Sequence, residues 1–182
     1  MGMGYWRSAS LIKQITERSR TRRSYPGKLM GLAGYGNVKE KMLPHLRQFF
    51  ITRDGKISDM IEGGNYYQGN GGKNLAATIQ KTLEDILFEE LDKYDTQIPL
   101  VVTGGCALNV IINEKIKDRY KREVYVPPNP HDGGLSLGHM FCYQKPKERV
   151  NVTYNGLPLL DRDKLKDYDT KKVTKKDIAR LL

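Results

Sequence analysis

Apolar residues recur at helical spacing most regularly between Asn74 and Tyr94. Leucine or isoleucine stands at positions 75, 79, 83, 86, 87 and 91, with acids and lysines between them. A stripe that repeats every three or four residues is typical of an amphipathic helix. The same spacing predicts shorter helices over residues 39–48, 107–119 and 135–143. A weaker pattern before Arg23 predicts another helix, which breaks at Tyr25-Pro26-Gly27.

Short apolar runs bounded by turn residues predict strands on either side of the helix over 107–119. Residues 98–103 read as a buried strand that ends at Gly104-Gly105, and residues 123–126 read as a second strand closed by prolines. The order strand, Gly-Gly, helix, strand, loop, helix predicts an α/β domain.

Turn residues and polar stretches divide the rest of the chain. Residues 49–58, with Asp54-Gly55 near the centre, predict a β-hairpin, and the Gly- and Asn-rich residues 65–73 predict a loop. After Gln144 the chain becomes polar, with few residues suited to a core. We therefore expect one domain over residues 1–145, followed over 146–182 by a linker and the start of a further domain.

The charge of the chain is strongly positive. Its 182 residues include 31 Lys and Arg against 21 Asp and Glu, a formal net charge of +10. The excess gathers in residues 18–28 and 164–180. Such charge attracts polyanions, although a solvated basic face with a loose tail gives the same pattern. Anionic small substrates and nucleic acid are both open as partners.

Neither a membrane nor an export route is indicated. No run approaches the ~18 apolar residues that a membrane span needs, and the first residues have no secretory leader pattern. Cys106 and Cys142 have neither metal-site spacing nor a disulfide framework around them. We expect a cytoplasmic protein without membrane contact.

The strand-to-helix turn at Gly104-Gly105 is the first candidate site. Without a Cβ, glycine lets backbone amides approach a ligand, and the helix N-terminus that follows favours phosphate. Asn109, in the first turn of that helix, has a side chain able to contact a base or a sugar. A tight turn without a ligand explains the two glycines equally well.

Asp132 is the second candidate, within the Pro- and Gly-rich residues 127–135. A carboxylate beyond the end of a strand lies where open α/β sheets bind ligands, and it suits a metal. Aspartate is also a favoured N-cap, so Asp132 could instead cap the helix over 135–143. His131 is either a neighbouring ligand or a loop residue, since one histidine alone is a poor metal signature.

Three ordered segments resemble the O-carbamoyltransferase family of nodulation and antibiotic enzymes. They are GKLMGLAGYG (27–36), GGCALNVIIN (104–113) and VPPNPHDGGLSLGH (126–139). Residues 74–87 also fit the helix that this family places before its Gly-Gly strand. The resemblance covers nearly the whole chain.

The resemblance implies a fold and a reaction. The fold is α/β, the second lobe of an actin-like ATPase (ribonuclease H-like) fold, with a β-hairpin and helices flanking a mixed sheet. It is similar to sugar kinases and to the tRNA threonylcarbamoyladenosine synthase. In the reaction, carbamoyl-adenylate made from carbamoyl phosphate and ATP is held near a metal while an acceptor hydroxyl attacks its carbonyl carbon.

The resemblance also implies roles for single residues. Gly104 and Gly105 match the contact with the phosphate or ribose of the adenylate, and Asn109 lies near the nucleoside. Lys28 matches a lysine on the nucleotide side of the cleft. Asp132 matches an aspartate ligand of a divalent metal, which the family implies is iron.

One part of the family pattern is missing from the sequence. The other metal ligands of the family lie in an N-terminal lobe with two histidines four residues apart, whereas His45, His131 and His139 are not so spaced. His131 also stands where a small residue is expected. The chain therefore resembles part of a catalytic domain, and a separate polypeptide could carry the other lobe.

Four interpretations of the function stay open. The chain could belong to an O-carbamoyltransferase, to a nucleic-acid-modifying threonylcarbamoyl-transferase relative, or to a nucleotide-binding remnant without turnover. It could also be a basic α/β domain with no nucleotide site. The acceptor cannot be read from the sequence, because acceptor pockets are built from variable loops.

Overall fold

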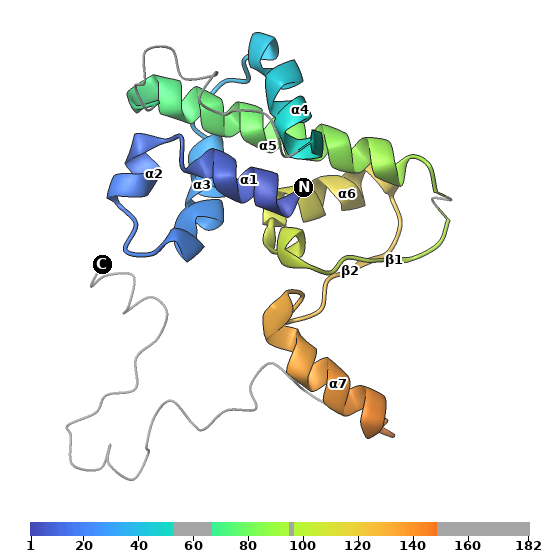
Figure 1. Ribbon diagram of the computed structural model, residues 1–182. Helices are drawn as coiled ribbons and strands as arrows, with labels where there is room; N and C mark the ends of the chain where they lie inside the picture. The colour runs from blue at the N-terminus through green and yellow to red at the C-terminus, as the bar shows by residue number, and fades with distance from the viewer. Residues whose placement is uncertain (53–66, 95–96, 149–182) are drawn as a thin grey trace, which may run out of the picture. The chain divides into compact units, whose positions relative to one another are not determined.

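A computed structural model describes residues 1–52, 67–94 and 97–148 (Figure 1). The chain divides into two units, Met1–Lys145 and Pro146–Leu182, and the helices and strands below belong to the first. The α-helices are α1 (Gly2–Ala9), α2 (Lys13–Glu17), α3 (Tyr25–Ala33), α4 (Leu43–Thr52), α5 (Gly69–Leu91), α6 (Val110–Tyr120) and α7 (Leu135–Tyr143). The strands are β1 (Leu100–Val101) and β2 (Val124–Tyr125), and short 3₁₀ helices are η1 (Arg22–Ser24), η2 (Glu40–Met42), η5 (Gly105–Leu108) and η6 (Asp132–Gly134). Across these described ranges, no helix is both long and apolar enough to cross a membrane.

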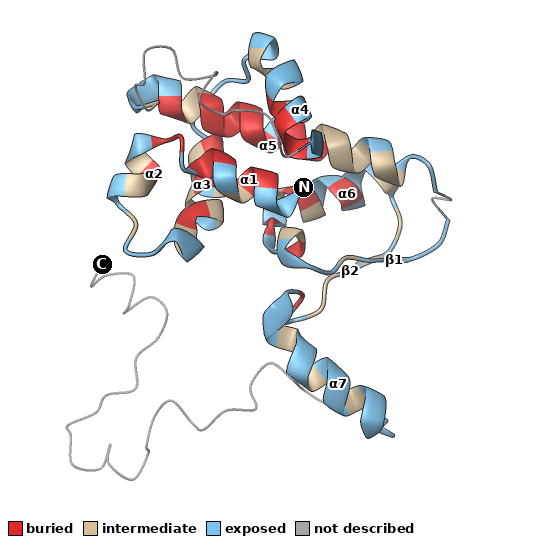
Figure 2. Cartoon of the chain, in the orientation of Figure 1, coloured by how far each residue is buried: buried red, intermediate tan, exposed pale blue. Residues whose placement is uncertain are grey.

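Helix α5 is the centre of the first unit, and α1, α3 and α4 pack along it (Figures 1 and 2). Its predicted stripe is the core, since Leu75, Ile79 and Leu83 are buried almost completely. Burying one such side chain stabilises a fold by about 1.5–3 kcal/mol. The helix predicted from the stripe is confirmed.

The loop predicted over residues 65–73 is wrong in its second part, because α5 already begins at Gly69. The glycines serve close packing there: a Cβ on Gly72 would lie 2.4 Å from the side-chain oxygen of Gln14 and 3.1 Å from Ile12. Gln14 also donates its amide to the carbonyl of Gly69. Residues 65 and 66 lie outside the described ranges.

The predicted β-hairpin is wrong where the structure describes it. Its first residues, 49–52, complete helix α4, because Leu46, Phe49 and Phe50 form a stripe that faces the core. Phe50 packs against Gly4 of α1, where a Cβ would come within 3.0 Å of the ring. The rest of the predicted hairpin, 53–58, lies outside the described residues.

The helix break predicted at Tyr25-Pro26-Gly27 is also wrong, because α3 begins there. Proline is tolerated in the first turn of a helix, where its missing N–H would have no intrahelical partner. After α3 the chain passes close over α5: a Cβ on Gly36 would lie 2.0 Å from the carbonyl oxygen of Lys73. The segment 27–36 is therefore a helix followed by a close backbone crossing.

Strands β1 and β2 are parallel, with Leu100 opposite Val124 and Val101 opposite Tyr125. They flank η5 and α6, as the order of elements predicts. Because side chains alternate along a strand, Leu100 and Val124 pack against the core while Val101 and Tyr125 are 61% and 56% exposed. The strand expected to be buried is therefore buried on one face. A mixed sheet and an actin-like lobe stay predictions.

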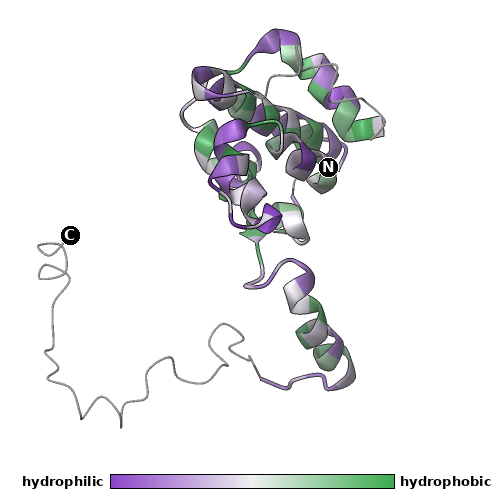
Figure 3. Cartoon of the chain, turned by 60° about the vertical axis from the view of Figure 1, so that its left-hand side comes forward, coloured by the Kyte–Doolittle hydropathy of each residue, from purple (hydrophilic) through white to green (hydrophobic). Residues whose placement is uncertain are grey.

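Helix α7 has the bounds that the sequence predicts, but none of its residues is buried (Figure 2). Leu135, Met140 and Tyr143 are all exposed. Figure 3 shows hydrophobic residues recurring along this helix at the lower right. The first unit thus leaves apolar side chains of α7 and the outer face of its small sheet uncovered.

Candidate functional site

A cavity of about 710 Å³ lies between α1, η1, α3, α5 and η5. Most of its lining is apolar, with two cationic side chains. The lining residues are Gly2, Met3, Tyr5, Trp6, Arg23, Ser24, Pro26, Gly27, Lys28, Met30, Leu83, Gly105, Cys106, Leu108 and Asn109.

Three of the five sequence-predicted site residues meet at this cavity. Lys28 comes from α3, Gly105 from η5 and Asn109 from the start of α6. Gly104 and Asp132 are not part of its lining. The fold therefore brings together two segments, around residues 28 and 105, that are far apart in the sequence.

Gly104 shapes the turn after β1. Its φ of +87° is one that residues with a side chain rarely adopt. Its N–H donates to the carbonyl of Pro130 at 2.6 Å and so ties the Gly-Gly turn to the loop before η6. For Gly104, the purely structural explanation is sufficient.

Gly105 has no such structural reason to be glycine. A Cβ at this position would meet no atom of the described residues within 4 Å, and its φ is not positive. The space beside its backbone is part of the cavity. A glycine next to open space is what close approach of a ligand to the backbone requires.

The side chain of Asn109 mainly stabilises the turn before α6. It is the N-cap of α6, where its Oδ1 accepts from the N–H of Ile112 at 3.1 Å. Its Nδ2 donates to Oε1 of Gln80 at 2.9 Å, and Gln80 donates back to Oδ1 at 3.3 Å. Asn109 also forms a side-chain hydrogen bond with Tyr5. Contact of Asn109 with a nucleoside stays a prediction.

A buried polar network continues from Asn109 beneath the cavity. Tyr5 donates to Oε1 of Gln80 at 2.8 Å, and Gln80 donates to Glu84 at 3.0 Å. The buried carboxylate of Glu84 is paired with Lys115 at 2.6 Å. Burial raises the pKa of Tyr5 well above its ordinary value, so its hydroxyl stays protonated. The network ties α1, α5 and α6 together and makes the floor of the cavity rigid.

Sequence reasoning missed Tyr5, Trp6, Gln80 and Glu84. Gln80 and Glu84 carried a signal, because they lie one turn apart next to the apolar stripe of α5 and are buried with it. Two polar side chains on the buried face of a helix need hydrogen-bond partners. Tyr5 and Trp6 carried none, since the helical pattern around them is weak.

The cations at the cavity belong to the basic segment 18–28. The Lys28 amine donates a hydrogen bond to the carbonyl oxygen of Arg18. The side chain of Arg23 is exposed. Arg18, Arg20 and Arg22 are exposed as well. Within the described ranges, no carboxylate forms an ion pair with any of these five side chains. The positive charge beside the cavity is uncompensated there.

Asp132 stands exposed at the start of η6 and does not cap α7. The N-cap of α7 is Gly134, which forms no side-chain cap. His131 caps η6 instead, with Nδ1 accepting from the N–H of Gly133 at 3.0 Å. Within residues 1–52, 67–94 and 97–148, no three His, Cys, Asp or Glu side chains lie close enough to hold a metal. A metal at Asp132 stays a prediction that these residues alone do not fit.

Cys106 lines the cavity as a free thiol. Burial raises its pKa above the ordinary thiol value. Because the thiolate is the reactive form, this environment disfavours a nucleophilic role. Cys106 therefore contributes to the apolar wall of the cavity.

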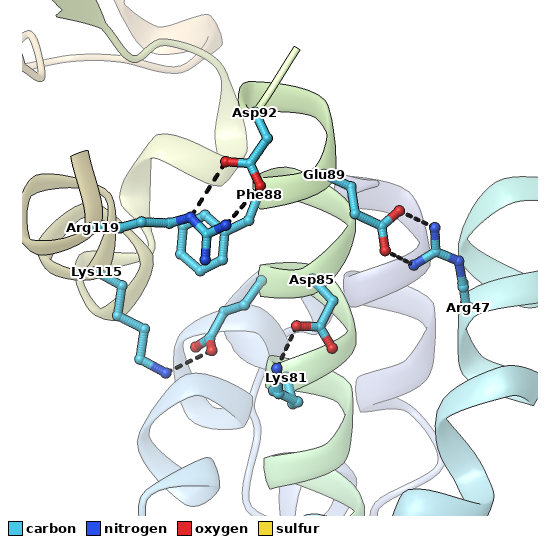
Figure 4. A pocket seen from close by; sticks show the side chains of 9 residues that line it. Arg47, Lys81, Asp85, Phe88, Glu89, Asp92, Lys115 and Arg119 are labelled. Carbon is cyan, nitrogen blue, oxygen red and sulfur yellow. Dashed lines mark hydrogen bonds and ion pairs between the residues drawn. The ribbon is translucent and has the colours of Figure 1, made fainter. Parts of the chain in front are cut away.

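A second hollow, of about 430 Å³, lies between α4, α5 and α6 and is lined by ion pairs (Figure 4). Arg47 of α4 forms an ion pair with Glu89, and Lys81 forms one with Asp85. From α6, Lys115 pairs with Glu84 and Arg119 pairs with Asp92. Tyr120 and Arg119 hold the pKa of Asp92 below its usual range. Each cation here has an anionic partner, so this hollow fastens α4 and α6 to α5 and offers no uncompensated charge.

Comparison with known proteins identifies the family to which the chain belongs. The model of the family described as carbamoyltransferase N-terminus matches residues 10–140. The uncharacterized protein MJ1051 of Methanocaldococcus jannaschii is 31% identical over 123 residues, which are 59% of this chain and 23% of that protein. The uncharacterized protein MJ1058 of the same organism is 31% identical over 135 residues, 65% of this chain and 22% of that protein. The chain thus spans less than a quarter of the length of these relatives. No solved structure matches.

Proposed function

The chain belongs to the carbamoyltransferase N-terminus family, and we propose that its cavity binds the adenylate used in O-carbamoyl transfer. The observation that supports this most is the meeting of Lys28, Gly105 and Asn109 at one cavity. In this proposal the ligand is ATP or the carbamoyl-adenylate that is made from ATP and carbamoyl phosphate. The carbamoyl group then passes to an acceptor hydroxyl, which gives up its proton, and AMP is the leaving group.

Different lining residues contact different parts of the ligand in this proposal. The backbone at Gly105 lies next to open space, so phosphate or ribose oxygens can approach it closely. The Lys28 amine, which donates to a neutral carbonyl, supplies positive charge for a phosphate. Asn109, which the family resemblance places near the nucleoside, lines the same cavity. Positioning the reactive carbonyl group in this way lowers the entropy cost of transfer.

A metal is no part of the steps assigned to this chain. The resemblance implies a divalent ion, iron, which would polarise the carbamoyl carbonyl. Asp132 offers it one exposed carboxylate, and the described residues add no neighbouring ligand. Several ligands are needed to hold such an ion firmly.

We further propose that a separate polypeptide carrying the other lobe completes the site. Parallel sheets are normally covered on both faces, yet Val101 and Tyr125 expose the outer face of β1 and β2. Leu135, Met140 and Tyr143 of α7 are exposed as well. A second lobe that covers these residues would also supply the missing metal ligands. Carbamoyl transfer by the chain should then require that added lobe.

A nucleic-acid-modifying relative is the second candidate, favoured by the exposed arginines 18, 20, 22 and 23. Lacking ion-pair partners among the described residues, they are free to contact phosphates. On duplex DNA, log K should fall linearly with log[salt], with a slope of about −0.9 per phosphate neutralised. Absence of retention on DNA or RNA at low salt would exclude this candidate.

Calorimetric titration with ATP and AMP tests the proposed cavity. Gly105→Val places a branched side chain in the open space of the cavity, so nucleotide binding should be lost while the fold is kept. Gly138→Val is the matched control, because Gly138 also faces open space but lies on α7, outside the cavity lining. Equal nucleotide affinity in the two variants would contradict the proposal.

A further inference from the structure

The two ends of the cavity differ in burial and in polarity. Tyr5, Leu83 and Asn109 form a buried floor, whereas Met3 and Leu108 are 52% and 53% exposed and mark the mouth. The polar atoms of the floor are engaged, since Tyr5 and Asn109 both bond to Gln80. The deep end therefore offers mainly apolar surface, suited to a flat and weakly hydrated group.

Trp6 forms a wall of this cavity, and its ring is fixed in orientation. Its Nε1 donates to the carbonyl of Arg22 at 3.0 Å. The ring also stacks on Tyr25, with centroids 6.4 Å apart and an interplanar angle of 24°. A fixed aromatic ring in an apolar wall is the element on which nucleic-acid bases stack.

Positive charge lies at the same cavity without a counter-charge. Arg23 is exposed, and within the described ranges no carboxylate pairs with it. The Lys28 amine has a backbone carbonyl as its acceptor. Two such cations suit the phosphate of a ligand whose other end is apolar and flat.

We propose that the cavity takes a purine nucleotide with its base inward, stacked on Trp6, and with its phosphate at Arg23 and Lys28. This rests on the proposed function for the nucleotide as ligand and adds the two residues that recognise its ends. Trp6 and Arg23 are binding residues that the family resemblance does not assign. The phosphate then lies at the exposed Arg23, where a reaction partner has access.

Trp6 is the single tryptophan of the chain, so its fluorescence reports on the cavity directly. Excited on the red edge of its absorption, where purines do not absorb, it should be quenched on addition of AMP. Adenosine should quench as well, at higher concentration. Ribose 5-phosphate carries the same phosphate without a base and should leave the emission unchanged.

Two pairs of variants separate the base contact from the phosphate contact in calorimetry. Trp6→Leu should weaken AMP binding at least about fivefold, as expected for the loss of one base stack, whereas Trp6→Phe keeps a ring and most of the affinity. Arg23→Gln should weaken AMP binding about threefold or more while adenosine binding is unchanged. Arg20→Gln, an exposed arginine outside the lining, should change neither.

The outcomes distinguish this inference from the function on which it rests. AMP binding that is lost in Gly105→Val, yet neither quenches Trp6 nor weakens in Arg23→Gln, would keep the proposed function and overturn the inference. No AMP binding to the unchanged chain would overturn both. If Trp6→Leu does not fold, the quenching of Trp6 and the Arg23 and Arg20 pair decide the matter by themselves.

Discussion

Gly104 and Gly105 are adjacent, yet the structure assigns them opposite sensitivities to the same substitution. Gly104 has φ +87° and ψ 176°, and its N–H is bonded to the carbonyl of Pro130. Gly105 has no positive φ, and a Cβ there would meet no atom of the described residues within 4 Å. Alanine at position 104 should therefore destabilise the fold, and alanine at position 105 should not.

The size of the difference follows from the backbone. A residue with a side chain in the region that Gly104 occupies costs of order 1–3 kcal/mol. Relaxing φ to avoid this strain would break the bond to Pro130, which is worth about 1 kcal/mol. Gly105→Ala instead restricts the unfolded chain and should stabilise by up to about 0.4–1 kcal/mol. The two variants should thus differ by about 2 kcal/mol or more, a large part of a typical stability of about 5–15 kcal/mol.

Equilibrium urea denaturation followed by far-ultraviolet circular dichroism measures this difference. Both variants should unfold with the same dependence on urea as the unchanged chain, and only the midpoint of Gly104→Ala should fall. Equal midpoints, or a larger loss in Gly105→Ala, would show that the turn does not have the backbone geometry described here. The cavity assigned to Gly105 would then lose its main support.

Three further predictions concern the floor of the cavity and Asp132. Above pH about 10 an unfolded tyrosine ionises while buried Tyr5 stays protonated, so the free energy of unfolding should fall as pH rises. This fall should be less steep in Tyr5→Phe, and equal slopes in the two proteins would refute the burial argument. Gln80→Leu leaves the hydroxyl of Tyr5 and the amide of Asn109 without their partner, so urea denaturation should show a loss of more than about 2 kcal/mol. Asp132→Asn should leave the melting temperature unchanged, and Mn²⁺ titration should show equally weak binding in both chains. Tight, stoichiometric Mn²⁺ in the unchanged chain would mean that the metal site is complete without another lobe.

The sequence predicted the elements whose apolar residues follow one clear period. Helix α5 was evident from its stripe, and α7 was predicted with its bounds. The errors lie where local signals conflict with packing. Phe49 and Phe50 resemble a strand locally but continue the helical stripe of Leu46. Gly72 stands in a stretch that resembles a loop, but its missing Cβ permits close contact with Ile12 and Gln14. Neither outcome follows from a local window, because in both the deciding neighbours come from another helix.

Part of the candidate site was predictable from the sequence. Gly105 and Asn109 were singled out from the strand-to-helix turn and Lys28 from the family resemblance, and the fold places all three at one cavity. The opposite reasons for the two glycines were not predictable, because φ and the space around a backbone depend on the folded turn. Tyr5 and Trp6 were missed since nothing in the sequence near Gly2 shows that α1 lies against η5.

What the sequence determines by itself is the periodicity of the helices, the net charge of +10 and the segments that carry the family. These depend on residue order and composition alone. Only the tertiary structure decides that Trp6, Arg23 and Lys28 border the same cavity as Gly105, and that Gln80 is the shared partner of Tyr5 and Asn109. It also decides that, among the residues described, no metal-ligand group forms around Asp132. The physical reason is that a cavity and a buried hydrogen bond arise between surfaces of separate elements. Which surfaces meet is settled by how those elements pack around α5.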